Sequence, residues 1–178
     1  NVPPSPPETS PLVSIVMPAY NAETTIRHSI NSVTAQTEVS WELLIVIDRN
    51  STDSTEEIAA ECAGSDPRIR LITGLTSGGC VFNRNSALAL AAGKFVAFLD
   101  SDDLWFPTKL EQQTRLMDET ESDFSCTGYR QIDQDGNELS VSIIPDSRVT
   151  HRDLLSDNRI GCLTVMFRRS RFPELRFV

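Results

Sequence analysis

The sequence predicts an α/β fold: a mostly parallel sheet with helices on both faces, followed by a smaller mixed α+β second half. Short apolar segments rich in β-branched residues alternate with segments of helical periodicity. The strand-like segments are continuously apolar, which is typical of strands buried on both faces. This alternation indicates right-handed βαβ crossovers, and 178 residues suffice for about one domain.

The first strand and helix follow a proline-rich start. Residues 12–17 form a short run that ends at Pro18 and predicts a buried strand. Over residues 23–36, apolar side chains recur at spacings of four and three, which predicts an amphipathic helix. A second buried strand is expected over residues 43–47, closed by Asp48.

The same pattern then repeats. Asp53 is expected to act as a turn former or helix N-cap ahead of the next helix. A third strand is predicted over residues 68–73 and an alanine-rich helix over residues 78–91. The fourth strand, residues 95–99, is the most apolar and ends at Asp100.

The rest of the chain is less regular. One more helix is expected after Pro107, followed by a strand over residues 123–131. A hairpin turn at Asp135-Gly136 and a return strand over residues 138–144 complete the smaller α+β extension.

Composition and charge exclude several classes of protein. Charged residues make up 23% of the chain, hydrophobic residues 39%, and no apolar run approaches the ~18 residues of a membrane-spanning helix. A net charge of −9 argues against nonspecific nucleic-acid binding, because a polyanion needs phosphate-neutralising cations. We therefore expect a soluble globular domain, and one that can still bind a polyphosphate through a metal ion.

The cysteines and the amino terminus predict little chemistry. The four cysteines are far apart and form no CxxC or Cys/His cluster, so we expect reduced thiols in a cytosol-like compartment. Residues 1–11 contain five prolines and lack the regions of a signal peptide. We expect them to be a disordered lead-in to a single domain spanning residues 12–178.

Polar clusters follow three of the predicted parallel strands. They are Pro18-Ala19-Tyr20-Asn21, Asp48-Arg49-Asn50-Ser51 and Asp100-Ser101-Asp102-Asp103. Ligands bind beyond the carboxyl ends of strands in such sheets, so the clusters should meet at one edge. Three acids in four residues repel one another unless a cation lies among them, and Mg²⁺ and Mn²⁺ prefer carboxylate oxygen. The sequence therefore predicts a divalent-metal or metal-diphosphate site.

Two other classes of phosphate-handling enzyme fit the motifs less well. Haloacid-dehalogenase-type phosphatases carry DxDxT after the first strand, whereas here Asp-x-Asp follows the fourth strand and no Thr comes after it. Nucleotidyltransferases usually carry a Gly-rich loop after the first strand, where residues 18–23 contain no glycine. A Walker-type loop is also absent from the sequence.

Four segments carry a resemblance to a known family. In chain order they are Val13–Asn21; Trp41–Asp48 with Ser51–Asp53; Gly78-Gly79 with Arg84-Asn85; and Phe98–Trp105 followed by Pro107 and Lys109. Together they resemble the family 2 glycosyltransferases, inverting enzymes with the Rossmann-like GT-A fold that use nucleotide-sugar donors. The resemblance covers about residues 12–115 strongly and continues more weakly through residues 160–169.

The resemblance implies a donor pocket built on the first two strands and the Gly-Gly segment. Pro18, Ala19 and Tyr20 would line the nucleobase pocket, with Tyr20 offering a ring face. The alternative for Tyr20 is a ring buried at the strand end. Asp48 would accept a hydrogen bond from the base of a UDP-type donor, since uracil N3–H is a donor. Gly79 would permit close approach of the backbone.

The acidic segment would hold the diphosphate and its metal ion. Asp100 and Asp102 would form the DxD motif, with Asp102 the direct ligand of Mg²⁺ or Mn²⁺ and Asp100, with Ser101, on the donor side near the ribose. The metal would act as a Lewis acid on the leaving diphosphate. Arg84 would supply positive charge or orient this segment, unless it is an ordinary helix-face cation paired with an acid. Asp103 is a candidate for acceptor contact.

The chain departs from the family pattern in two places. Arg49 follows Asp48 where the family often has an acid or Asn, and could pair with Asp48 or reach the donor phosphate. Inverting transfer also needs a general base near the acceptor hydroxyl, which the family usually supplies after an Arg-Phe-Pro-like stretch. That base is expected beyond Val178, since Glu174 precedes the expected position. We therefore expect a C-terminally truncated chain.

The resulting prediction is an enzyme core that transfers sugar from a nucleotide-diphosphate donor, UDP-sugar favoured, to an acceptor hydroxyl in surface polysaccharide biosynthesis. The alternative is a nucleotide-sugar-binding fragment without turnover. The expected partners are the donor and a saccharide or lipid-linked acceptor, not nucleic acid. The expected location is the cytoplasm, with peripheral association at the inner face of a membrane left open. The sequence does not indicate the donor sugar or the oligomeric state.

Overall fold

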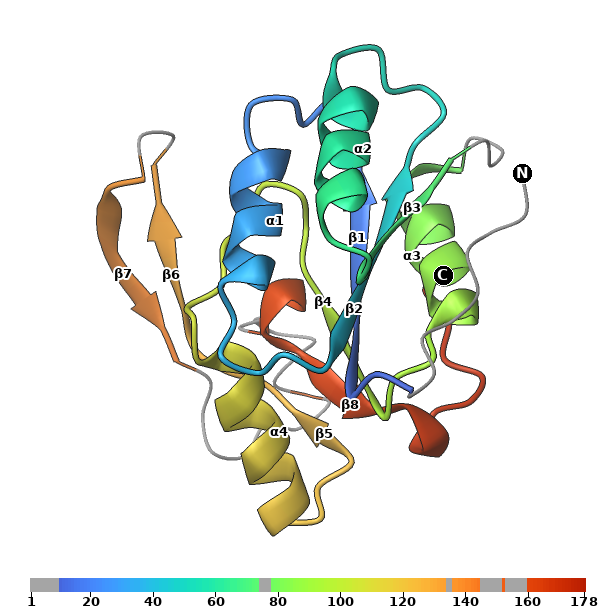
Figure 1. Ribbon diagram of the computed structural model, residues 1–178. Coiled ribbons are helices and arrows are strands. Elements are labelled where there is room, and N and C mark those ends of the chain that lie inside the picture. Colours follow the sequence, from blue (N-terminus) through green and yellow to red (C-terminus); the bar gives the residue numbers. More distant parts are fainter. Residues whose placement is uncertain (1–9, 74–77, 134–135, 145–151, 153–159) are drawn as a thin grey trace.

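The computed structural model describes residues 10–73, 78–133, 136–144, 152 and 160–178. Its main sheet has six strands in the order β3-β2-β1-β4-β8-β5, with helices on both faces (Figure 1). The predicted α/β class is therefore confirmed. Most of the proline-rich lead-in, residues 1–9, lies outside the described residues.

The elements alternate along the first part of the chain as predicted. The parallel strands are β1 (Val13–Ala19), β2 (Trp41–Ile47), β3 (Ile69–Ile72) and β4 (Phe95–Phe98). The helices are α1 (Ile26–Thr34), α2 (Thr55–Ser65), α3 (Gly79–Leu90) and α4 (Lys109–Glu119). The remaining strands are β5 (Phe124–Ser125), β6 (Tyr129–Ile132), β7 (Glu138–Ile143) and β8 (Met166–Arg168).

Two apolar layers explain why the central strands are buried along their whole length. On one face, Ile15 and Met17 of β1 pack in a cluster with residues of α1, α2 and α4. On the other face, Val16 packs in a second cluster with Ala87 of α3. Because side chains alternate along a strand, a strand covered on both faces must be continuously apolar.

β1 continues through Pro18 to Ala19, so the prediction that it stops at Pro18 was wrong. The backbone of Ala19 faces β2, where its carbonyl accepts from the Asp48 N–H at 2.8 Å. Pro18 therefore faces the β4 side, where the strand pairing ends at Val16. Its missing N–H removes no bond from the sheet, which is the condition for proline in a strand.

α1 begins at Ile26, later than the predicted residue 23. The preceding segment is held in a turn: Asn21 has φ 45°, and Asp53 accepts a hydrogen bond from the Glu23 N–H at 3.0 Å. The same carboxylate accepts from the Thr55 N–H at 3.1 Å. Asp53 thus ties together the starts of α1 and α2, in agreement with its prediction as a turn former.

The single strand predicted over residues 123–131 is two strands in the structure. β5 pairs with β8 at the edge of the main sheet, whereas β6 pairs with β7 in a separate hairpin. The chain leaves the main sheet over residues 126–128, which are neither helix nor strand. The hairpin itself was predicted; Asp135 of its turn lies outside the described residues.

The second half of the chain also completes the main sheet. β8 lies antiparallel between β4 and β5, so it covers the edge that β4 would otherwise expose. Within the described ranges, no helix combines the length and the apolar character needed to cross a membrane.

Candidate functional site

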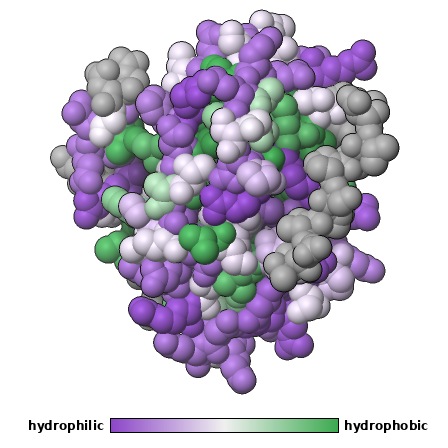
Figure 2. Space-filling view, viewed as in Figure 1, coloured by the Kyte–Doolittle hydropathy of each residue, from purple (hydrophilic) through white to green (hydrophobic). Residues whose placement is uncertain are grey.

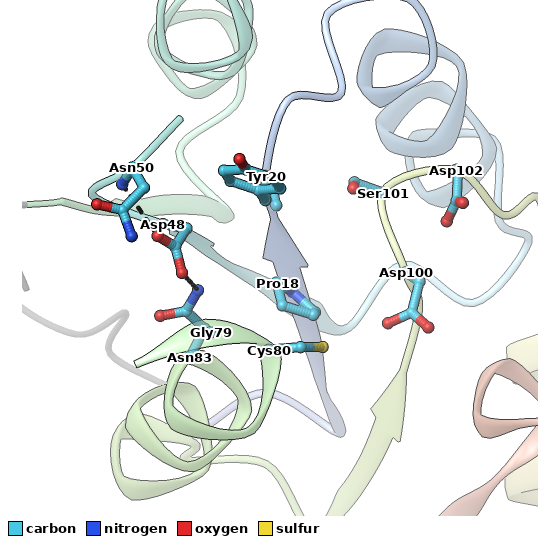
Figure 3. Close-up of a pocket in the computed structure, with 11 residues that line it drawn as sticks. Pro18, Tyr20, Asp48, Asn50, Gly79, Cys80, Asn83, Asp100, Ser101 and Asp102 are labelled. Carbon is cyan, nitrogen blue, oxygen red and sulfur yellow. Dashed lines mark hydrogen bonds between the residues drawn. The ribbon is translucent and has the colours of Figure 1, made fainter. Parts of the chain in front are cut away.

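A cavity of about 400 Å³ lies at the carboxyl ends of β1, β2 and β4, beside the start of α3 (Figure 3). The residues that line it are Pro18, Ala19, Tyr20, Asp48, Asn50, Gly79, Cys80, Asn83, Asp100, Ser101 and Asp102. The three polar clusters therefore meet at one edge of the sheet, as their positions after parallel strands predicted. We call this space the first cavity.

Most of the residues singled out from the sequence line the first cavity, and two do not. Arg84 lies beside it and contacts Asp100. Asp103 lines a second, neighbouring cavity. Asn50 belongs to one of the predicted polar clusters but was given no role of its own, and Cys80 and Asn83 were not predicted as lining residues.

Asp48 is a buried carboxylate held by neutral donors. Its side chain lies at the end of β2 and the residue is 5% exposed. Oδ1 accepts from the Asn50 backbone N–H at 2.9 Å, and Oδ2 accepts from Nδ2 of buried Asn83 at 3.1 Å (Figure 3). Arg49 is exposed, and the hydrogen bonds found for the Asp48 side chain within the described residues come from Asn50 and Asn83. Each carboxylate oxygen keeps a further lone pair for a ligand.

Tyr20 and Gly79 form opposite parts of the cavity wall. Tyr20 is 55% exposed, so the alternative of a ring buried at the strand end was wrong. Gly79, at the start of α3, has φ 66°, a left-handed conformation that favours glycine. No heavy atom lies within 4 Å of the position that a Cβ would take there, so the backbone is open to an approaching group.

The acidic segment is anchored by an arginine. Nη2 of Arg84 donates to Oδ1 of Asp100 at 2.5 Å, and the Arg84 side chain is only 15% exposed. Arg84 therefore contacts the acidic segment, and the prediction that it orients this segment stays a prediction. Repulsion among the three acids is partly relieved by this ion pair. Asp102 is exposed and lines both cavities.

The second cavity, of about 820 Å³, lies between the loop after the acidic segment and the β6–β7 hairpin. Its exposed apolar residues are Leu104, Phe106, Ile132 and Leu139. Figure 2 shows hydrophobic side chains among hydrophilic ones beside the hairpin, on the face in view. This cavity thus joins an apolar surface to the acidic edge of the first cavity.

Two ionisable groups of the second cavity have shifted pKa values. Burial, followed by the charges of Asp102 and Asp100, raises the pKa of the Asp103 carboxyl to about 6. Burial lowers the pKa of the Lys109 amine to about 7. The Lys109 Nζ lies 3.8 Å from the centre of the Trp105 ring and has no hydrogen-bond partner among the described residues.

The acidic edge fits a metal ion that is shared with a ligand. The described residues contain no group of three or more His, Cys, Asp or Glu side chains arranged to hold a metal. Mg²⁺ in phosphate-handling sites needs only one or two carboxylates, because phosphate and water supply the other oxygens. Exposed Asp102, with Asp100 beside it, matches that donor set.

Comparisons with known proteins agree on one family. The family model described as glycosyl transferase family 2 matches residues 14–174. Over 166 residues the chain is 43% identical to the Escherichia coli UDP-Glc:alpha-D-GlcNAc-diphosphoundecaprenol beta-1,3-glucosyltransferase WfgD, covering 93% of this chain and 64% of that protein. It is 41% identical over 166 residues to Bacillus subtilis TuaG, a glycosyltransferase provisionally named for teichuronic acid biosynthesis, covering 93% and 66%. The chain thus spans just under two thirds of these relatives.

A solved structure shares the fold. S. aureus TarS 1–349 in complex with UDP matches with a TM-score of 0.74 and 27% identity, over 91% of this chain and 48% of that one. The same protein in complex with UDP-GlcNAc matches with the same TM-score of 0.74, over 91% and 46%.

Proposed function

Because the chain belongs to glycosyl transferase family 2, we propose that it carries the donor site of an enzyme that transfers a sugar from a nucleotide-diphosphate sugar to an acceptor hydroxyl. The likeness to TarS agrees with the GT-A fold predicted from the sequence. The observation that carries the proposal is the first cavity, where Tyr20, Asp48 and Asp102 converge from the ends of three strands.

We assign the part of the first cavity beside Tyr20 and Asp48 to a uracil base. Asp48 offers a carboxylate acceptor, and uracil N3–H is a donor, so the two are complementary. Asn50 and Asn83 fix the orientation of that carboxylate without neutralising its charge. The exposed ring of Tyr20 is available to stack on the base. The nucleotide-sugar complexes of TarS are with UDP and UDP-GlcNAc, which supports a UDP-sugar as donor.

The diphosphate would lie against the acidic edge with a divalent ion. Asp102 would hold Mg²⁺ or Mn²⁺, and Asp100, fixed by Arg84, would hold the ion or the ribose together with Ser101. When bound, such an ion stabilises charge on the leaving nucleoside diphosphate. The open backbone at Gly79 leaves space for the phosphates.

The second cavity is the place that we assign to the acceptor. It shares Asp102 with the first cavity, so groups bound in the two would meet. Its apolar rim suits an acceptor with a lipid part, and the name of WfgD gives a diphosphoundecaprenol-linked acceptor for that enzyme. We assign contact with the acceptor to Asp103, which lines this cavity. We assign no described residue as the general base of the reaction, so the identity of that base remains open to experiment.

Calorimetry of nucleotide binding tests the donor site. We expect UDP with Mn²⁺ to bind the chain more tightly than GDP or ADP by about tenfold or more. EDTA should weaken UDP binding, and Asp102→Asn should abolish this metal response because a neutral amide is a poor ligand for Mn²⁺. The control is Glu119→Gln, which removes the same charge from an exposed position in α4. This variant should bind UDP like the unaltered chain. Equal affinities for the three nucleotides, or a metal response that survives Asp102→Asn, would contradict the assignment.

A further inference from the structure

The segment that follows β8 returns to α3 and is fixed there by the side chain of Asn85. Its Nδ2 donates to the Phe177 carbonyl at 3.0 Å, and the Phe177 N–H donates to its Oδ1 at 2.9 Å. One amide side chain thus satisfies both backbone groups of a residue 92 positions later in the sequence. This pair of bonds determines where the Phe177 ring lies.

The Phe177 ring contacts both β4 and Arg84. It meets the Phe98 ring edge-on, with centroids 5.3 Å apart and an interplanar angle of 90°. The Cζ of Arg84 lies over the same ring, 5.4 Å from its centroid. This is within the ~6 Å over which an aromatic face attracts a guanidinium.

Arg84 needs a neighbour such as the Phe177 ring to hold its side chain in position. The Nε–H is buried and has no hydrogen-bond partner in the described ranges, and Nη2 donates to Asp100. An arginine held by a single carboxylate keeps freedom in its long side chain unless neighbours restrict it. Phe177 supplies that restriction, although it does not line the first cavity.

We infer that Phe177 and Asn85 are positioning residues for the donor site: they hold the Arg84 guanidinium where it fixes the Asp100 carboxylate at the cavity wall. The Asp100 side chain is 31% exposed, so its direction is not determined by burial alone. Loss of the ring should let Arg84 move, and Asp100 should then lose its fixed direction. This inference rests on the proposed function only for its effect on nucleotide binding.

The structural half of the inference can be tested without a ligand. In ¹⁵N NMR spectra, the Arg84 Nε–Hε signal is assigned by its loss in Arg84→Lys. Phe177→Leu keeps apolar contact with Phe98 but removes the aromatic face. We expect it to lower the ¹⁵N–¹H NOE of the Arg84 Nε and to speed its hydrogen exchange. Asn85→Ala acts through the other contact and should have the same effect.

The matched control is Phe172→Leu. Phe172 lies in the same segment and meets Phe167 edge-on, with ring centroids 5.6 Å apart, and among the described residues it makes no contact with Arg84. It should lower thermal stability to a similar degree and leave the Arg84 signal unchanged. Unchanged Arg84 signals in both Phe177→Leu and Asn85→Ala, or an equal change in the control, would overturn the inference.

The effect of Phe177 on the donor site is tested by calorimetry, with UDP and Mn²⁺ as the probe. Phe177→Leu should raise the dissociation constant about 3- to 10-fold, the range expected for a lost cation–π contact, and Phe172→Leu should not. An unchanged affinity in Phe177→Leu would contradict the link to the donor site. If the unaltered chain does not bind UDP, the proposed function fails, while the NMR comparison still decides whether Phe177 positions Arg84.

Discussion

The carboxylate of Asp48 illustrates how single residues of this fold prepare a charged group for a ligand. Asp48 is buried at the end of β2, yet its partners, Asn50 and Asn83, are neutral. A buried carboxylate paired with a cation would already have its charge satisfied. Neutral donors fix its direction and leave it as an acceptor for a group that brings its own N–H.

Asp48→Ala should lower UDP affinity by about tenfold or more, because the base loses its charged acceptor. It should also destabilise the fold by about 1–3 kcal/mol, since the buried Asn83 amide loses its partner. Asp66→Ala is the control, because it removes a part-buried acid that pairs with Arg68 after α2. Calorimetry and urea unfolding should show lost stability in both variants but lost UDP binding only in Asp48→Ala. Equal UDP binding by the two would argue against the role of Asp48.

Lys109 gives a pH-dependent prediction. Burial lowers the pKa of its amine to about 7, whereas an unfolded lysine titrates near 10.4. Between these values the unfolded chain binds more protons, so this residue makes stability rise with pH from about 7 to about 10. Lys109→Met removes the buried amine and keeps the apolar stem. It should raise the free energy of unfolding at pH 7 by about 1–3 kcal/mol, because the Trp105 face already offsets part of the burial cost.

Urea unfolding at pH 7 and pH 10 checks this expectation. The gain from Lys109→Met should be smaller at pH 10, where about 30% of the unfolded lysine is already neutral, and it should approach zero only above the unfolded pKa of about 10.4. Lys94→Met is the control, since Lys94 is exposed and paired with Asp118. A gain that does not depend on pH, or the same gain in the control, would show that the buried amine is not the cause.

Most residues of the first cavity could be predicted from the sequence, because acids and turn formers stand out directly after buried strands. Asn83 could also have been found, since it lies one helical turn after Gly79 and so on the same face of α3. Phe177 could not. Its contact with Arg84 depends on hydrogen bonds between the Asn85 side chain and the Phe177 backbone, 92 residues apart, which leave no local pattern.

At the scale of elements, the loop between α3 and β4 sets the position of the strand that carries the acidic segment. Oγ of Ser14 accepts from the Gly93 N–H at 2.8 Å and donates to buried Glu42 at 2.6 Å. Glu42 in turn pairs with Arg70 at 2.9 Å. This buried network lies at the amino-terminal ends of the strands, whereas the first cavity lies at their carboxyl ends. It fixes where β4 begins.

Gly93→Ala should destabilise the protein by about 1–3 kcal/mol. Its Cβ would lie 2.5 Å from the Ser14 backbone N and 2.8 Å from the Phe95 carbonyl, so backbone atoms would have to move. Gly64→Ala, in α2, meets no heavy atom within 4 Å and should raise stability by up to about 1 kcal/mol through helix propensity. Urea unfolding of the two variants is the measurement, and similar effects in both would contradict the close-approach explanation.

The parallel part of the sheet was predictable because each strand and helix has its own local periodicity. The antiparallel part was not. β8 has three residues and pairs with both β4 and β5, which lie far from it in the sequence. The residues between β5 and β6 carry no turn signal as strong as an Asn-Gly or Asp-Gly pair, so the predicted strand ran across the break.

At the scale of the whole molecule, the net charge of −9 and the proposed anionic ligand are compatible. Part of the negative charge gathers at Asp100, Asp102 and Asp103, where a divalent ion would join protein carboxylates to a diphosphate. The two cavities share Asp102, so the proposed donor and acceptor spaces adjoin each other. Residues of the β6–β7 hairpin line the second cavity, which we propose as the acceptor space.

The most direct test is a crystal structure of the chain with UDP and Mn²⁺. We expect the uracil between Tyr20 and Asp48, with the diphosphate and the metal at Asp100 and Asp102. UDP bound in the second cavity, or a metal held away from Asp102, would contradict the central claim that the first cavity is the donor site.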